Sequence, residues 1–140
     1  MIVYFDTSAL VPLLVVEPGS GTARDLWDHA SRVASVRLVY PAARAALAQA
    51  RRVGRLTARQ LRRSVDALDH LCAQLDIVEL DADLAHHAGV LAETHRLRGY
   101  DAVHLAAAEW LADVDVVMAA GDRDLLGAAS RLGLATAAVG

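Results

Sequence analysis

The chain begins with Met1-Ile2-Val3-Tyr4-Phe5-Asp6-Thr7-Ser8-Ala9-Leu10, in which a short apolar run leads directly into an aspartate. The run from Ile2 to Phe5 predicts a buried strand that ends where Asp6 begins. Burying a carboxylate in that position costs free energy unless a group of opposite charge lies beside it. In open α/β sheets, ligands bind at the carboxyl ends of the strands, so Asp6 is the first candidate for a functional residue.

Strand-like segments alternate with helical ones along the whole chain. The expected strands are Ile2–Phe5, Val33–Val36, Ile77–Glu79, Asp115–Met118 (or from Val114) and Ala135–Val139. Because helices separate them, the connections are crossovers and the sheet is mostly parallel. The sequence therefore predicts an α/β fold of three layers, with a central sheet of about five strands flanked by helices. We expect residues 1–140 to form a single domain, since this length supplies one good core.

Caps and breakers set the expected helix boundaries. The expected helices are a segment from Thr7 or Ser8 toward Glu17 that Pro12 distorts, Ser20–Ala30, Pro41–Val53, Ala58–Leu75, a segment from Asp81 to about Arg98, Ala102–Leu111, and a segment from Asp122 to Leu132. Thr57 and Asp101 are expected to be N-caps, Pro41 a first helical residue, and Gly99 a helix end.

Composition excludes several classes of protein. Hydrophobic residues make up 55% and charged residues 22% of the chain, which indicates a globular protein, while only 4% are aromatic, which disfavours a base-stacking surface. Cys72 is the only cysteine, so an intrachain disulfide and a thiolate zinc cluster are excluded. The apolar run from Ala9 to Val16 is too short to cross a bilayer, and no basic segment precedes it. We expect a cytoplasmic protein without a membrane partner.

Three aspartates are expected at one edge of the sheet. Asp6 ends the first strand, Asp101 starts a helix, and Asp122 follows a later strand. Each could simply cap a helix, and taken singly Asp101 or Asp122 is better explained that way. Together, however, they form the kind of carboxylate set that Mg²⁺ and Mn²⁺ prefer. Such a site can orient a phosphodiester and activate water.

Arginine supplies every basic residue of the chain. Seven of the 14 lie between positions 44 and 63, namely Arg44, Arg51, Arg52, Arg55, Arg59, Arg62 and Arg63. Guanidinium groups suit phosphate contacts, whereas a solvated helix face explains the same cluster equally well. The net charge of −3 disfavours a protein that coats nucleic acid in general.

The ordered motifs Phe5-Asp6-Thr7-Ser8-Ala9-Leu10, Tyr100-Asp101-Ala102-Val103-His104-Leu105-Ala106 and Gly121-Asp122-Arg123-Asp124-Leu125-Leu126 resemble those of PIN-domain ribonucleases, in particular the VapC-type toxins of bacterial toxin–antitoxin pairs. The resemblance covers nearly the whole chain. It implies metal-dependent RNA cleavage with Asp6, Asp101 and Asp122 as catalytic metal ligands. It also implies that Asp124 is a more variable accessory acid, and that Thr7 or Ser8 forms hydrogen bonds beside the metal site.

The same resemblance implies several partners. The expected RNA substrates are of the transfer or ribosomal kind, and the arginines Arg44, Arg51, Arg52 and Arg55 are expected to hold the RNA backbone. A cognate antitoxin would block the acidic groove, plausibly through an inserted arginine. The chain is expected to form a homodimer.

One acid of the family pattern is missing from this chain. Chains of the family it resembles carry a glutamate early in the third helix, where this sequence has Ala42 within Tyr40-Pro41-Ala42-Ala43-Arg44. The Ser or Thr that the family usually has two residues before the last aspartate is also absent, and Ala120 stands there. We therefore expect a weak or inactive enzyme. Either the chain is a naturally weakened member, or it is a deliberately disarmed toxin, which the otherwise intact motif favours.

Two other functions stay open at this stage. The first is a catalytically dead module on the same fold that binds RNA or antitoxin. The second is a phosphatase or receiver-like domain with Asp6 as nucleophile, which the absence of lysine disfavours. His104 is better explained as a partly buried helix residue than as a catalytic acid. His86, His87 and His95 lie on one expected helix without an i, i+4 pair, which disfavours a zinc site there.

Overall fold

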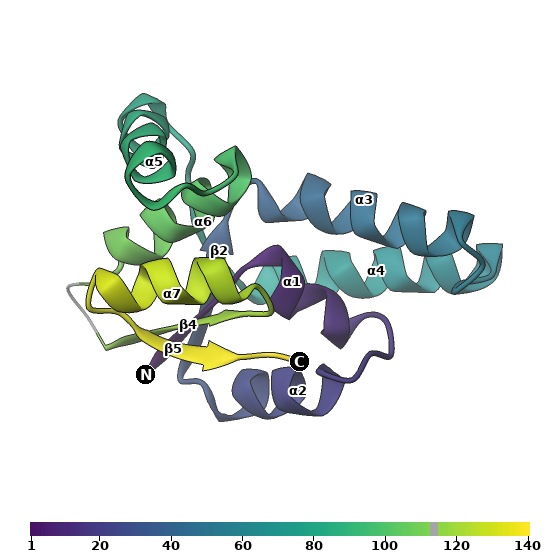
Figure 1. Cartoon of the computed structure of the whole chain (residues 1–140). Coiled ribbons are helices and arrows are strands. Elements are labelled where there is room, and N and C mark those ends of the chain that lie inside the picture. Colours follow the sequence, from purple (N-terminus) through teal and green to yellow (C-terminus); the bar gives the residue numbers. More distant parts are fainter. Residues whose placement is uncertain (113–114) are drawn as a thin grey trace.

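A computed structural model describes residues 1–112 and 115–140, and its centre is a parallel sheet (Figure 1). The described strands are β1 (Ile2–Phe5), β2 (Arg32–Val36), β3 (Asp76–Val78), β4 (Val116–Ala120) and β5 (Ala135–Ala138), arranged in the order β3-β2-β1-β4-β5. Every neighbouring pair is parallel, as the alternation of strands and helices predicted. The predicted fold class is therefore confirmed.

Helices cover both faces of this sheet. The described helices are α1 (Thr7–Leu10), the 3₁₀ turn η1 (Val11–Leu13), α2 (Ser20–His29), α3 (Val39–Arg52), α4 (Ala58–Gln74), α5 (Ala82–His95), α6 (Gly99–Trp110) and α7 (Arg123–Arg131). In Figure 1, α3 and α4 run side by side away from the sheet, while α5, α6 and α7 gather on another side of it. The described helices do not include one with the length and hydropathy needed to cross a membrane.

Strand residues alternate between two apolar cores. Tyr4 and Met118 pack in a core with α5, α6 and α7, whereas Val3 and Phe5 pack in a core with α1, α2, α3 and α4. Successive side chains of a strand point to opposite faces, which explains why β1 can be fully buried on both. The sheet with a helical layer on each face gives the three predicted layers.

The strand order places a switch point beside β1. Crossovers from β1 run to β2 on one side, while the chain later returns to β4 on the other side. β1 and β4 pair in register, with Phe5 opposite Ala119, and the Asp6 amide donates to the Ala119 carbonyl at 3.2 Å. The carboxyl ends of these two strands therefore lie together, and this is where open α/β sheets bind ligands.

Several predicted boundaries were wrong by a few residues. β2 and β3 each begin one residue earlier than expected, β4 runs from Val116 to Ala120, and β5 stops at Ala138; Val114 lies outside the described residues. α3 begins at Val39, so Pro41 is its third residue rather than its first. The first turn of a helix has no intrahelical use for its N–H groups, and proline is therefore tolerated there.

The connection between α5 and α6 differs most from prediction. Gly99 was expected to end one helix, and Asp101 was expected to cap the next. Instead α5 ends at His95, because Arg96 takes a left-handed conformation with φ of 55°, and Gly99 is the first residue of α6. Asp101 consequently lies inside the first turn of α6. Thr57 and Asp122 are N-caps as predicted, and Thr57 forms a full capping box with Gln60.

Candidate active site

A cavity of about 740 Å³ opens at the carboxyl ends of β1 and β4. All three predicted aspartates, Asp6, Asp101 and Asp122, line it, although they come from distant parts of the sequence. The remaining lining residues are Thr7, Ser8, Val11, Glu17, Leu38, Pro41, Ala42, Ala45, Ala46, Arg98, Tyr100 and His104. We refer to Asp6, Asp101 and Asp122 as the acid cluster.

Asp6 is the most buried member of the acid cluster, with only 3% of its surface exposed. Its Oδ1 accepts hydrogen bonds from the Ala9 amide at 2.9 Å and from the Ser8 hydroxyl at 2.7 Å. Asp6 is thus the N-cap of α1, so the alternative that this aspartate caps a helix is also correct. The Ser8 Oγ in turn accepts the Gly121 amide at 2.7 Å, which ties the ends of β1 and β4 together.

Asp101 and Asp122 share a single arginine. The Nε of Arg98 donates to Oδ2 of Asp101 at 3.0 Å, and its guanidinium lies 3.5 Å from Oδ2 of Asp122. Asp122 uses its other oxygen to cap α7, where it accepts the Asp124 and Leu125 amides at 2.8 and 3.2 Å. One carboxylate oxygen of Asp122 is therefore committed to the helix and the other faces Arg98.

Burial and neighbouring charge both act on Asp6. Burial is the main cause that raises the pKa of Asp6 to about 7, and the charges of Asp101 and Asp122 raise it further. The hydrogen bonds from Ser8 and Ala9 act in the opposite direction because they favour the carboxylate. The acid cluster is therefore a site of concentrated negative charge that a cation would stabilise.

His104 is buried beneath the site and holds two hydroxyl groups. Its Nδ1 lies 2.8 Å from the Tyr4 hydroxyl, and its Nε2 lies 3.0 Å from the Thr7 hydroxyl. Burial lowers the pKa of His104 to about 3, so the imidazole is neutral at physiological pH. A neutral ring with both nitrogens engaged is suited to positioning Thr7 beside Asp6, and this agrees with the expected structural role.

Ala42 faces the same cavity as the acid cluster. It lies in the second turn of α3, and the neighbouring residues Ala45 and Ala46 line the cavity with it. A longer side chain at position 42 would enter this space. The structure thus places the alanine that interrupts the family pattern at the edge of the site.

Some predicted site residues lie away from the cavity. Asp124 is exposed and contributes its backbone amide to Asp122, while its side chain does not line the cavity. None of the predicted substrate-binding arginines, Arg44, Arg51, Arg52 and Arg55, lines it either. Arg55 reaches the rim indirectly, because its guanidinium is 3.5 Å from Glu17.

Two lining residues with charge were missed at the sequence level. The first helix was expected to run toward Glu17; instead the 3₁₀ turn at Pro12 ends it early, and Glu17 lines the cavity. Arg98 was expected near the end of the helix that starts at Asp81, whereas it is the N-cap residue of α6. No local sequence pattern predicts that Glu17 or Arg98 lines the cavity, because the position of each depends on where the chain turns.

The carboxylates of the acid cluster fit a hard divalent cation in donor type and charge. In their present arrangement, however, the described residues do not include three His, Cys, Asp or Glu side chains grouped closely enough to hold one ion. Asp6 instead accepts hydrogen bonds from Ser8 and Ala9, and Asp101 and Asp122 both contact Arg98.

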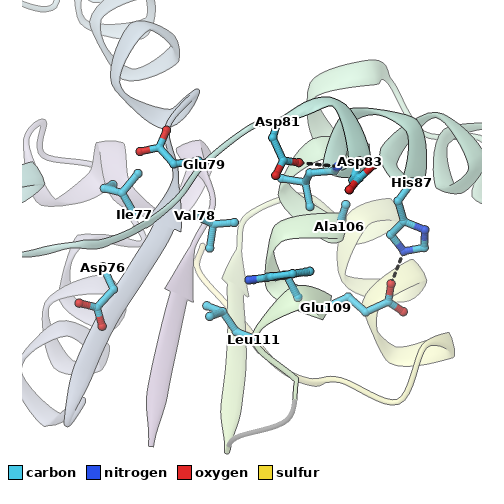
Figure 2. Close-up of a pocket in the computed structure, with 12 residues that line it drawn as sticks. Asp76, Ile77, Val78, Glu79, Asp81, Asp83, His87, Ala106, Glu109 and Leu111 are labelled. Carbon is cyan, nitrogen blue, oxygen red and sulfur yellow. Dashed lines mark hydrogen bonds and ion pairs between the residues drawn. The ribbon is translucent and has the colours of Figure 1, made fainter.

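A second cavity, of about 700 Å³, lies between β3, α5 and α6 (Figure 2). It also contains acidic side chains, of which Asp76, Glu79, Asp81 and Glu109 each have a partner. Asp81 caps α5, and Figure 2 shows His87 turned toward Glu109, with which it makes a close contact. Asp76 and Glu79 pair with Arg32 and Arg37. The cavity at the acid cluster is therefore the better candidate for an active site.

Comparison with known proteins agrees with this geometry. A family model described as the PIN domain matches residues 3–129, and the chain therefore belongs to the PIN-domain family. Within that family it is of the VapC type, since it is 47% identical over 124 residues to the ribonucleases VapC45 and VapC49 of two Mycobacterium tuberculosis strains. The aligned segment covers 89% of this chain and 86% of each relative.

Solved structures share the fold at much lower identity. VapC20 of Mycobacterium tuberculosis, a toxin that cleaves the sarcin–ricin loop, superposes with a TM-score of 0.68 at 21% identity and covers 90% of this chain and 94% of its own. VapBC2 of Rickettsia felis, bound to a DNA fragment of its promoter, gives a TM-score of 0.66 at 14% identity over 100% of both chains. These likenesses establish the PIN fold.

Proposed function

We propose that this protein is the endoribonuclease toxin of a toxin–antitoxin pair and that its activity depends on Mg²⁺ or Mn²⁺. The observation that carries the proposal is the convergence of Asp6, Asp101 and Asp122 on one cavity in a chain closely related to named VapC ribonucleases. A bound divalent ion would supply water activation and neutralise charge on an RNA phosphate.

The roles of the protein residues follow from their contacts. Asp6, Asp101 and Asp122 would hold the ion, and the Ser8 hydroxyl would orient the Asp6 carboxylate while it joins β1 to β4. Thr7 is kept beside the acid cluster by His104. The cavity at the carboxyl ends of the strands is open enough, at about 740 Å³, to admit a phosphodiester segment.

A cognate antitoxin is the proposed protein partner. Relatives of this chain carry VapC names, and the structural neighbour VapBC2 is a complex bound to promoter DNA. An antitoxin segment that offers positive charge would suit the acid cluster by charge complementarity. A homodimer and a cytoplasmic location are part of the same proposal.

Ala42 supports a second candidate function, a binding module that lacks catalysis. It removes one carboxylate from the cavity wall, which lowers the negative charge available to an ion. A loss of two orders of magnitude in rate would correspond to about 2.7 kcal/mol of transition-state stabilisation. The two functions differ in whether activity returns when the acid is restored.

The test compares the chain with its Ala42→Glu variant on cellular RNA in Mg²⁺, in Mn²⁺ and in EDTA. We expect metal-dependent cleavage by Ala42→Glu at a rate about a hundredfold or more above that of the unaltered chain. Ala58→Glu is the matched control, because it adds the same side chain at an exposed position of α4. Silence of both forms at high enzyme concentration, with antitoxin binding retained, would favour the binding module.

A further inference from the structure

Arg98 is held over the acid cluster by three contacts. Besides its bonds to Asp101 and Asp122, the guanidinium carbon lies 5.3 Å from the centre of the Tyr100 ring. Its backbone is the N-cap position of α6 and has no side-chain capping bond, so the side chain is not used to start the helix. The arginine is therefore committed to the cavity rather than to local secondary structure.

Arg98 is surrounded by acidic side chains in the cavity. Among the described residues that line the cavity, it is the one with a permanent positive charge, against the carboxylates of the acid cluster and Glu17. His104 is the other basic group there, and burial keeps it neutral. The guanidinium thus supplies the counter-charge that a bound cation would otherwise supply.

We propose that Arg98 is a resident cation of the acid cluster, and that a divalent metal binds Asp101 and Asp122 only after this guanidinium has moved away. The inference rests on the metal-dependent function proposed above. A metal needs direct contact with carboxylate oxygens, and Arg98 faces Oδ2 of both residues. A guanidinium cannot act as a ligand, and its charge repels the incoming ion.

The displacement is physically reasonable because Arg98 is mostly solvated. Its side chain is 68% exposed, whereas that of Asp101 is 8% exposed. Ion pairs with an exposed partner contribute little free energy, so a divalent ion can outcompete them. The long side chain can then swing to the rim, where an RNA phosphate would meet it.

The inference predicts a change in metal affinity without any reference to catalysis. Mn²⁺ binding to the full chain, followed by electron paramagnetic resonance in the absence of RNA, is expected to be roughly fivefold to tenfold tighter in Arg98→Gln than in the unaltered chain. Arg98→Lys should fall between them, because lysine keeps the charge and loses the planar fork. Arg123→Gln is the matched control, since Arg123 is exposed beside Asp122 and has no ion pair with a described residue.

A second readout follows the arginine itself. In the unaltered chain, Mg²⁺ should move the Arg98 Nε–H signal in nuclear magnetic resonance toward its position in the Asp101→Asn variant, which lacks the charged acceptor. Equal Mn²⁺ affinity of the unaltered chain and Arg98→Gln, with an unmoved Nε–H signal, would overturn the inference and leave the proposed function intact. No Mn²⁺ binding by any form, Ala42→Glu included, would refute the metal-dependent function and this inference together.

Discussion

The hydroxyl of Ser8 lies 2.7 Å from one carboxylate oxygen of Asp6 and 2.9 Å from the other. The same hydroxyl accepts the Gly121 amide, so a single side chain joins the end of β1, the acid cluster and the end of β4. Since the hydroxyl has one proton to donate to Asp6 and lone pairs for Gly121, both bonds are satisfied together. Ser8 therefore fixes Asp6, the most buried member of the acid cluster, against the end of β4.

Replacement of Ser8 by alanine should loosen this junction. The variant loses the bond to Asp6 and leaves the Gly121 amide without its acceptor, which we expect to lower the free energy of unfolding by about 1–3 kcal/mol. Because the Ser8 hydroxyl favours the charged form of Asp6, its loss should raise the pKa of Asp6 further. Urea denaturation measures the first effect, and ¹³C nuclear magnetic resonance of the Asp6 carboxyl group measures the second. An unchanged pKa would contradict the role assigned to the hydroxyl.

Asp6 should make the protein less stable as the pH rises. Burial raises the pKa of Asp6 from 3.8 to about 7, so the unfolded chain loses this proton at a lower pH than the folded chain does. The contribution of Asp6 to stability therefore falls between about pH 4 and pH 7 and stays low above that range. The Asp6→Asn variant cannot ionise, so it should not lose stability over this pH range, and its side-chain oxygen still accepts from Ser8 and Ala9.

We expect Asp6→Asn to be more stable than the unaltered chain at pH 8 in EDTA, with an upper limit of about 4 kcal/mol. Near pH 4 the two should unfold alike. The control is Asp28→Asn, which changes an exposed carboxylate outside the acid cluster. Its stability should follow that of the unaltered chain across the whole pH range. Chemical denaturation across this pH range gives the comparison, and parallel curves for Asp6→Asn and the unaltered chain would exclude a raised pKa.

His104 should impose the opposite pH dependence. Burial lowers the pKa of His104 from 6.5 to about 3. Between these pH values the unfolded chain binds a proton at His104 and the folded chain does not. The contribution of His104 to stability is therefore complete above pH 6.5 and is lost as the pH falls toward 3. In the unaltered chain this slope partly cancels that of Asp6, which is why single variants are needed to see either one.

His104→Leu tests that role. Leucine leaves the hydroxyl groups of Tyr4 and Thr7 without the ring, and we expect a loss of about 2–4 kcal/mol at pH 7. The difference from the unaltered chain should shrink as the pH is lowered to 5. His86→Gln, at an exposed position of α5, serves as control. A constant difference at both pH values would show that the ring is not kept neutral by burial.

The sequence was most informative where local chemistry decides the structure. An apolar run that ends in an aspartate predicted both β1 and the place of Asp6, and the cap residues Thr57 and Asp122 announced their helices. The start of α6 was missed because the left-handed residue is Arg96, where a glycine is the usual signal, and Gly99 suggested a helix end. Arg96 is exposed, and the turn is closed by the backbone, where the Leu97 amide donates to the Ala92 carbonyl at 3.1 Å.

The site itself could be predicted only in part. Three aspartates at three strand or helix ends converge because the sheet is parallel, and that follows from the order of elements. Arg98 and Glu17 line the same cavity because of where the chain turns, which the order of elements does not predict. Glu17 follows a turn at Pro12, and Arg98 reaches back from the α6 N-terminus, so their presence requires the folded arrangement.

The arginines near the end of α3 should bind RNA at a distance from the acid cluster. In Figure 1, α3 and α4 project away from the sheet, and Arg51 and Arg52 are the last residues of α3. Arg51 is exposed, and Arg52 bonds only the neutral Gln49 side chain among the described residues, so both charges are available to phosphates. Their contribution should be to affinity and should not change the chemical step.

A double variant with Arg51→Gln and Arg52→Gln is therefore expected to weaken binding of a mixed-sequence single-stranded RNA. In EDTA, where cleavage is prevented, the slope of log affinity against log salt concentration should become shallower by about 1.4 if both residues contact phosphates. Arg24→Gln with Arg131→Gln removes the same charge from α2 and α7 and is the matched control. Fluorescence anisotropy measures the slopes. If the two double variants have the same slope, the cluster at the end of α3 is a solvated helix face and RNA is held elsewhere.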